Sequence, residues 1–238
     1  MSAGGYKRIL LKLSGEYLAD GTGDNVDFEI VRTLALEVKK CQKLGVQLGV
    51  VVGGGNFWRG RNVWQMEKAR ADYVGMLATA MNATILYDVF LKEGVDTRLQ
   101  MVIAMPDIAE CYVRDRAVKH LDQGRVIIFG GGTGSPYFST DTAAALKAID
   151  IKADVIFKAT HSVDGVYDKD PVKNENAVKY DTLSCDEIFR KRLEVMDMSA
   201  VALCAEHNIP VCVFSIKNPE NLIKAIFKQK IGTMIVCA

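Results

Sequence analysis

Residues 130–141, GGGTGSPYFSTD, are the stretch on which the predicted fold depends. A short apolar run, residues 125–129 (RVIIF), precedes it and predicts a buried strand. Residues 142–151 (TAAALKAIDI) follow it and predict a helix with Asp141 or Thr140 as its N-cap. A strand that enters a glycine loop and then a helix builds an anion site, because backbone N–H groups and the helix N-terminus attract negative charge.

The same loop could be a tight strand-to-helix turn without a ligand. Such a turn needs one or two glycines, whereas this loop carries four glycines and four serine or threonine hydroxyls. Because hydroxyls add further hydrogen-bond donors, the composition favours a phosphate-like ligand. The hydroxyls belong to Thr133, Ser135, Ser139 and Thr140.

The chain has 238 residues, of which 49% are hydrophobic and 25% are charged, as expected for one large globular domain or two small ones. A formal net charge of +1 provides no long-range attraction for nucleic acid or an anionic membrane, and we expect neither as a partner. The sequence MSAGGYKR at the start lacks an apolar signal core, and no apolar run reaches the length of a membrane span. These features favour a cytoplasmic protein.

The six cysteines show neither C-x-x-C spacing nor metal-ligand spacing to a histidine. Most lie in apolar runs, so we expect buried free thiols in a reducing compartment. They are at positions 41, 111, 185, 204, 212 and 237.

Two further strands lead into glycine-containing loops. Residues 7–13 (KRILLKL) carry Lys12 near their end and run into SGE, and residues 46–52 (VQLGVVV) run into GGGN. Nearly continuous apolar strands are typical of a parallel sheet covered on both faces. Arg59 follows the second loop; it could be a surface charge, but this position favours a forked donor to a phosphate.

Strand and helix patterns alternate along the whole chain, so the sequence predicts an α/β class with a mostly parallel sheet. Ligands of such sheets bind where the carboxyl ends of strands open into loops, here after Leu13, Val52, Phe129 and Ala159. Helix 69–93 has apolar residues on two sides, which predicts either burial in one large core or a homo-oligomer interface. Other helices are predicted over residues 28–44, 113–123, 185–193, 198–207 and 219–229, and other strands over residues 96–103, 154–159, 210–215 and 232–236.

Several common site motifs are absent from the sequence. It has no G-x-x-x-x-G-K-[ST] P-loop, no G-x-G-x-x-G fingerprint, no G-x-S-x-G elbow and no H-E-x-x-H. Hydrolase triads and zinc chemistry therefore have little support. Phosphoryl transfer needs cations, backbone donors and organising carboxylates, which Lys12, Arg59, the glycine loops, Asp141 and Asp197 could supply.

Six segments together resemble the bacterial uridylate kinases of the amino acid kinase superfamily, over residues 6–234. They are KLSGE (12–16), VVVGGGNFWRG (50–60), ADYVGMLATAMN (71–82), GTGSPYFSTD (132–141), VDGVYDKDP (163–171) and VMD (195–197). The resemblance implies a three-layer α-β-α sandwich in a single domain, residues 1–238. Residues up to about 150 would mainly hold the phosphate acceptor, and residues from about 151 would mainly hold ATP.

The family transfers the γ-phosphate of ATP to UMP with Mg²⁺, in pyrimidine nucleotide biosynthesis. The resemblance implies catalytic roles for Lys12, Arg59, Asp141 and Asp197, and no protein ligand set for the metal, because nucleotide phosphates carry most of the Mg²⁺ coordination. The implied ATP residues are Lys12, Leu13, Ser14, Gly15, Gly55, Arg59, Thr160, His161, Tyr167 and Asp170. The implied UMP residues are Gly54, Asp72, Thr133, Gly134, Ser135, Pro136, Tyr137, Phe138, Ser139 and Thr140.

Two departures from the family pattern bear on regulation and on adenine recognition. Residues 20–25 read DGTGDN, with less glycine than is usual in a region tied to activation by GTP. The loop at residues 160–162 is one residue longer than in some members, which leaves open whether Thr160 or His161 faces adenine. Members are typically homohexamers inhibited by UTP. The alternatives are a carboxylate or carbamate kinase of the same fold, and a non-catalytic nucleotide store or sensor.

Overall fold

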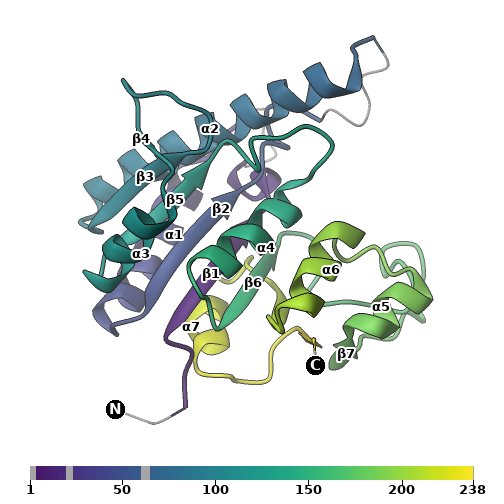
Figure 1. Cartoon of the computed structure of the whole chain (residues 1–238). Helices are drawn as coiled ribbons and strands as arrows, with labels where there is room; N and C mark the ends of the chain where they lie inside the picture. Colours follow the sequence, from purple (N-terminus) through teal and green to yellow (C-terminus); the bar gives the residue numbers. More distant parts are fainter. Residues whose placement is uncertain (1–3, 20–23, 60–64, 238) are drawn as a thin grey trace.

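The computed structural model describes residues 4–19, 24–59 and 65–237. Over these residues the chain forms one nine-stranded sheet in the order β4-β3-β5-β2-β1-β6-β8-β9-β7 (Figure 1). Neighbouring strands pair in parallel except β8 and β9, so the mostly parallel sheet is confirmed. The strands are β1 (Arg8–Leu13), β2 (Gln47–Val52), β3 (Thr97–Met101), β4 (Glu110–Cys111), β5 (Val126–Gly130), β6 (Val155–Thr160), β7 (Thr182–Ser184), β8 (Val211–Ser215) and β9 (Thr233–Val236).

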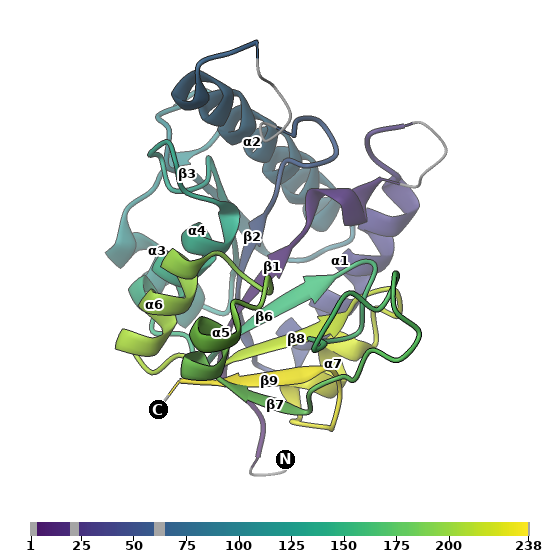
Figure 2. The ribbon, with the colours of Figure 1, turned by 90° about the vertical axis from the view of Figure 1, so that its right-hand side faces the viewer.

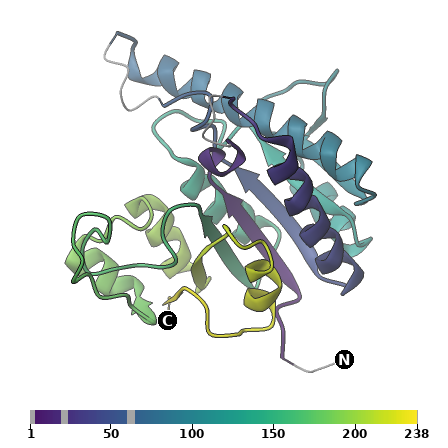
Figure 3. The same ribbon diagram turned by 180° about the vertical axis from the view of Figure 1, so that it is seen from behind.

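Helices cover both faces of the sheet, which confirms the three-layer sandwich (Figures 2 and 3). Each face has its own apolar core, because the central strands are buried on both sides. Helices α1 (Phe28–Lys43), α2 (Lys68–Lys92) and α7 (Asn221–Ile226) cover one face. Helices α3 (Arg114–Asp122), α4 (Thr140–Asp150), α5 (Cys185–Lys191) and α6 (Met198–Glu206) cover the other.

The predicted elements are present, with small shifts at their ends. Helix α4 starts earlier than expected, and its N-cap is Ser139 rather than Asp141 or Thr140, because the Ser139 hydroxyl accepts a hydrogen bond from the Asp141 N–H. Three short elements were not predicted: β4, β7 and a 3₁₀ turn over Gly15–Leu18. They are only two to four residues long, too short for a periodic pattern to show.

The long helix α2 has one buried and one exposed apolar side. Leu86 and Phe90 are fully buried, whereas Leu77 and Met81 keep 46% and 50% of their surface. Within this chain, α2 is therefore buried on only one of its two apolar sides. In the part of the chain that the structure describes, α2 is the one helix long and apolar enough to cross a membrane; half of that window is buried here, and a core helix meets the same criteria.

The structure corrects the expectation of free thiols at two positions. Cys185 and Cys237 form a disulfide, with their Cα atoms 5.4 Å apart and a separation of 52 positions in sequence. Pairing of β7 with β9 places the start of α5 beside the end of β9, a proximity that apolar patterning does not reveal. Free cysteines remain at positions 41, 204 and 212, which are buried as expected, and at position 111, which is exposed.

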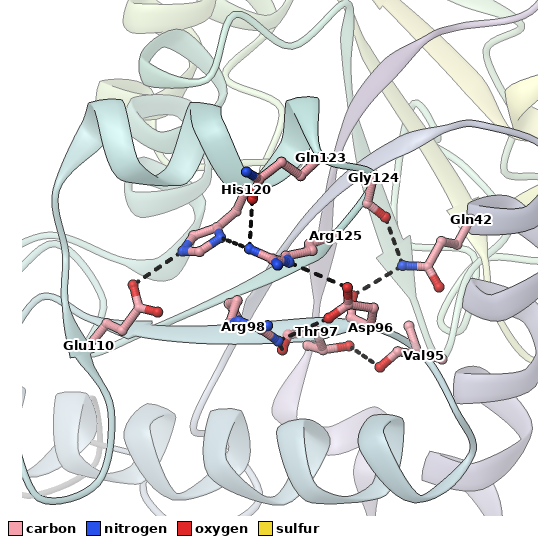
Figure 4. A network of polar contacts seen from close by, with 10 residues as sticks. All are labelled: Gln42, Val95, Asp96, Thr97, Arg98, Glu110, His120, Gln123, Gly124 and Arg125. Atoms are coloured by element: carbon pink, nitrogen blue, oxygen red, sulfur yellow. Dashed lines mark hydrogen bonds and ion pairs between the residues drawn. The ribbon is translucent and has the colours of Figure 1, made fainter.

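A polar network ties the amino ends of β3 and β5 to α3 (Figure 4). Arg125 lies before β5; its Nε is 3.3 Å from Asp96, and its Nη1 is 3.1 Å from the His120 ring. The other ring nitrogen of His120 is 3.4 Å from Glu110. Apart from Glu110, which is level with Gln100 near the carboxyl end of β3, the network lies at the strand ends opposite the glycine loops.

Candidate active site

A cleft of about 730 Å³ opens at the carboxyl ends of β1, β2 and β5. Leu13 on β1 is level with Val52 on β2 and with Ala159 on β6, so the loops that follow these strands open at one edge of the sheet. The cleft is lined by the loops after β1 and β2, the first turns of α2, the start of α6, and Gly132, Thr133, residues 137–140 and Thr142. Residues expected to bind the ATP phosphates and residues expected to bind the phosphate acceptor therefore line the same cleft.

The loop after β2 packs directly on α2 at Gly54. A Cβ at this position would lie 2.7 Å from the Ala78 Cβ and 3.0 Å from the Gly75 carbonyl oxygen, so only glycine fits. Buried Asn82 on α2 donates a hydrogen bond of 2.7 Å to the Gly53 carbonyl and exchanges hydrogen bonds with Asn56. Asn82 had no predicted role. The feature of the sequence that could have indicated this role is an asparagine among apolar positions of a helix, because a buried amide needs hydrogen-bond partners.

The centre of the cleft holds one carboxylate between two lysines. Lys12 Nζ lies 2.8 Å from Oδ1 of Asp141, and Lys158 Nζ lies 2.6 Å from Oδ2. All three side chains are at most 14% exposed. Lys12 lines the cleft, whereas Lys158 comes from the neighbouring strand β6 and does not line it. Sequence reasoning found Lys12 and Asp141 and missed Lys158.

The two lysines set the protonation state of Asp141. Burial raises the pKa of this carboxyl, but the charges and hydrogen bonds of Lys12 and Lys158 outweigh burial and hold the pKa well below its usual range. Burial and the nearby Lys12 charge lower the pKa of Lys158 to about 8, although Asp141 acts in the opposite direction. A carboxylate of such low basicity is a poor proton acceptor and a good organiser of cations.

Asp197 connects α6 to the acceptor loop. It is the N-cap of α6, where its Oδ1 accepts a 2.9 Å hydrogen bond from the Ala200 N–H and one of 2.7 Å from the Thr142 hydroxyl. Its Oδ2 accepts a hydrogen bond from the Ser139 hydroxyl. Both carboxylate oxygens are thus used to hold the loop and helix that carry Asp141, rather than to pair with Lys12.

Asp72 connects α2 to the same loop from the other side. Its Oδ2 accepts a 2.9 Å hydrogen bond from the Tyr137 N–H, and its Oδ1 pairs with Lys68 one turn earlier. Burial raises the pKa of Asp72, but the bonds from Lys68 and Tyr137 outweigh burial and lower it. Tyr137 has a φ of 72°, a left-handed conformation that this backbone hydrogen bond helps to hold.

Arg59 lies at the mouth of the cleft, between it and an adjoining cavity of about 510 Å³. Its guanidinium pairs with Glu16 at 2.8 Å and is 63% exposed. An exposed guanidinium beside the Gly55 backbone can exchange its Glu16 partner for an anion. His161 lines the adjoining cavity and lies beside Tyr17, with ring centroids 6.4 Å apart.

The sequence model of the amino acid kinase family matches residues 7–215. The chain belongs to the amino acid kinase family. The Lys12–Asp141 pair and both glycine loops lie within the matched segment, so the cleft belongs to the part of the chain that defines membership.

Solved structures of two bacterial UMP kinases share this amino acid kinase fold over nearly the whole chain. The enzyme of Bacillus anthracis has a TM-score of 0.94 and 36% sequence identity, covering 98% of this chain and 96% of that one. The enzyme of Ureaplasma parvum has a TM-score of 0.91 and 33% identity, covering 97% and 98%. Uridylate kinase of Archaeoglobus fulgidus has a TM-score of 0.73 and 30% identity, covering 95% and 99%.

The cleft of this amino acid kinase collects most of the residues that sequence predicted. It is lined by Lys12, Ser14, Gly15, Gly54, Gly55, Arg59, Asp72, Thr133, Tyr137, Phe138, Ser139, Thr140 and Asp197. Asp141 contacts Lys12 at its centre. Leu13 is fully buried in β1, and Gly134, Ser135 and Pro136 belong to the loop but do not line the cleft. Within the motif at residues 50–60, Gly60 lies outside the described residues, as do positions 20–23 of DGTGDN.

The predicted adenosine residues lie apart from the main cleft. The Thr160 hydroxyl bonds to the Val163 carbonyl and, at 3.1 Å, to the Phe214 carbonyl. The Tyr167 hydroxyl donates to Asp164 at 2.5 Å, and Asp164 lines a separate cavity of about 330 Å³ with Ser215 and Asn221. Asp170 is exposed and accepts a hydrogen bond from the Val172 N–H.

Proposed function

We propose that this amino acid kinase is an ATP-dependent UMP kinase, which transfers the γ-phosphate of ATP to UMP and releases UDP and ADP. In this reaction an oxygen of the UMP phosphate bonds to the γ-phosphorus, and the bond from that phosphorus to the β-γ bridging oxygen breaks. The arrangement of Lys12, Asp141 and Lys158 beside the loop at residues 132–140 carries the proposal. The similarity to UMP kinase structures over at least 97% of the chain supports it.

The chemistry of the cleft suits the meeting of two phosphates. Their mutual repulsion is offset by the Lys12 ammonium, by the Arg59 guanidinium at the mouth and by the N-terminus of α4. Asp141 holds Lys12 in place and does not need to remove a proton, because a nucleoside monophosphate is largely ionised near neutral pH. The backbone of the glycine loops supplies N–H donors without side chains that would block approach.

Mg²⁺ fits this site as a partner of the nucleotides. Within the described residues, no group of three or more His, Cys, Asp or Glu side chains could hold a metal ion. Both oxygens of Asp141 already pair with lysines, and both oxygens of Asp197 already accept hydrogen bonds from hydroxyls. The nucleotide phosphates would therefore hold most of the Mg²⁺ coordination. When bound, the ion would neutralise phosphate charge and act as a Lewis acid.

Substrate placement and biology follow from the same proposal. Residues up to about 150 hold mainly UMP, with Asp72 at the ribose and residues 133–140 around the uracil and phosphate. Residues from about 151 hold mainly ATP, with Thr160 or His161, Tyr167 and Asp170 at the adenosine. The protein acts in cytoplasmic pyrimidine nucleotide biosynthesis, with UTP as an inhibitor. The exposed side of α2, at Leu77 and Met81, contributes to a homohexamer.

One acceptor assay tests the function. ADP release from ATP is measured with UMP, CMP, glutamate or carbamate as the acceptor, and without any acceptor. ADP release that depends on UMP is the expected result. Turnover with glutamate or carbamate alone would identify a carboxylate or carbamate kinase, and nucleotide binding without turnover would identify a store or sensor.

A further inference from the structure

Lys12 and Lys158 are direct neighbours in the sheet. They are paired Cα positions on the parallel strands β1 and β6, so their side chains leave the sheet on the same face. That face is the one covered by α4, whose first turn carries Asp141. A lysine side by side with another lysine inside a sheet is unfavourable unless an anion lies between them.

Asp141 provides that anion, and each of its two carboxylate oxygens pairs with a different lysine. One oxygen faces Lys12 at 2.8 Å and the other faces Lys158 at 2.6 Å, so the carboxylate plane is fixed from both ends. The next nearest charge that acts on Lys158 is Asp197, which the N-terminus of α6 and two hydroxyls hold in place. Lys12, Lys158 and Asp141 together carry an excess positive charge, which favours an anionic ligand in the cleft.

The two lysines differ in access to that ligand. Their side chains are buried to a similar degree, 12% exposed for Lys12 and 14% for Lys158. Lys12 is part of the cleft wall, whereas Lys158 does not line the cleft and contacts Asp141 instead. Any effect on the reaction has to pass through the carboxylate that both lysines share.

We propose that Lys158 is a positioning residue for phosphoryl transfer: it fixes the Asp141 carboxylate so that this carboxylate holds Lys12 toward the transferring phosphate. The inference rests on the proposed kinase function. It goes beyond that function by assigning the reaction a residue that never touches substrate. A buried ion pair that serves only folding is the competing explanation, and it predicts different kinetics.

The test compares Lys12→Ala, Lys158→Met and the double variant in the ADP-release assay. We expect Lys158→Met to lower kcat about 10- to 100-fold, with KM for ATP and UMP changed less than about threefold. Because Lys158 acts through Lys12, the double variant should be no slower than Lys12→Ala alone. Lys158→Arg, which keeps the charge, should recover at least part of kcat. Multiplicative losses in the double variant, or a normal kcat in Lys158→Met, would overturn the proposal.

Lys147→Met is the matched control. Lys147 is also buried and also faces an aspartate, Asp150, but it lies outside the cleft, and kcat should not change. If Lys158→Met does not fold, Lys158→Gln replaces it, because glutamine keeps a donor for Asp141 without the charge. A wild type that phosphorylates only another acceptor would defeat the UMP proposal, and the same comparison would then use that acceptor.

A crystal structure of the Lys158 variant gives a readout independent of turnover. We expect a rotated Asp141 carboxylate and a Lys12 Nζ moved from the position it has beside Oδ1. An unchanged Lys12–Asp141 contact would overturn the inference, even if the wild type showed no kinase activity at all.

Discussion

Lys12 Nζ lies 2.8 Å from Oδ1 of Asp141. The carboxyl end of the central strand β1 and the first turn of α4 are therefore joined by a buried ion pair. The ammonium is held at the cleft wall before any ligand arrives. Preorganised charge of this kind contributes to a transition state without reorganisation during the reaction.

Lys12→Ala should therefore act mainly on turnover. We expect kcat to fall roughly 10²- to 10³-fold, while KM for UMP changes little, because the ammonium acts most strongly on the charge of the transferring group. Steady-state ADP release measures both constants. Lys7→Ala is the control, since Lys7 is exposed just before the amino end of β1 and should give wild-type kinetics. A Lys12→Ala enzyme with normal kcat would contradict the role given to this residue.

Adjacent glycines at the end of β2 should respond differently to alanine. At Gly54 the new Cβ would lie 2.7 Å from the Ala78 Cβ, so Gly54→Ala should cost about 1–3 kcal/mol of unfolding free energy. At Gly55 the nearest atom would be Glu16 Oε1, at 3.4 Å, so Gly55→Ala should fold normally. It should instead weaken ATP binding, because Gly55 lines the cleft and its new methyl group would lie beside Glu16, the partner of Arg59. Urea denaturation and calorimetric ATP titration separate the two effects.

The parts of the site that sequence reasoning recovered are those that depend on local pattern. Buried parallel strands are continuous apolar runs, and the loops after them are marked by glycine, so Lys12, Gly54 and Asp141 could be placed from neighbours in the chain alone. Lys158 was missed because VIFKAT is recognised as a strand whatever its lysine does. The role of Lys158 depends on the strand register that places it beside Lys12, and this register cannot be deduced from the sequence.

Contacts between distant segments were missed for the same reason. Asp197 was expected to organise the lysine, yet its oxygens hold Ser139, Thr142 and the start of α6. The Cys185–Cys237 disulfide depends on a pairing of β7 and β9, and β7 is too short to be recognised. In each case the residue type was visible and the partner was not.

The disulfide makes a simple prediction about thiol content. Protein unfolded without reductant should show four reactive thiols, because two of the six cysteines are paired. Reduction before the assay should raise the number to six. Colorimetric thiol titration measures both values. Six thiols without reductant, on protein purified under air, would show that the pair is reduced in solution, as is usual for cytosolic proteins.

Asp72→Ala should weaken acceptor binding. The change removes the partner of the Tyr137 N–H and so loosens the loop at residues 132–140 from α2. We expect KM for UMP to rise about tenfold, equivalent to the loss of one hydrogen bond to a charged group, with a smaller effect on KM for ATP. Asp88→Ala is a matched control, because Asp88 makes the same type of i,i+4 pair with Lys92 on the same helix, away from the cleft. Equal effects of the two substitutions on KM for UMP would contradict the role of Asp72.

Lys147 should make stability depend on pH in a defined window. Its side chain is 9% exposed, its Nζ lies 3.3 Å from the centre of the Tyr112 ring, and Asp150 is 3.7 Å away. Burial lowers its pKa to about 8, partly opposed by Asp150. The folded pKa is below the unfolded value, so the unfolded chain binds more protons between these two values, and the free energy of unfolding rises with pH across that window.

Lys147→Met removes this titration while keeping a side chain of similar length. The free energy of unfolding of the variant minus that of the wild type should therefore be constant below the folded pKa of about 8. Above it the difference should fall by up to about 1.4 kcal/mol per pH unit. Urea denaturation at several pH values from about 7 to 9.5 measures the difference and stops short of ionising Tyr112, whose pKa burial and Asp150 raise. The shift of Lys158 is common to both proteins and cancels. A difference that stays constant through the whole range would mean that Lys147 keeps its proton, and that the Tyr112 ring and Asp150 compensate for its burial.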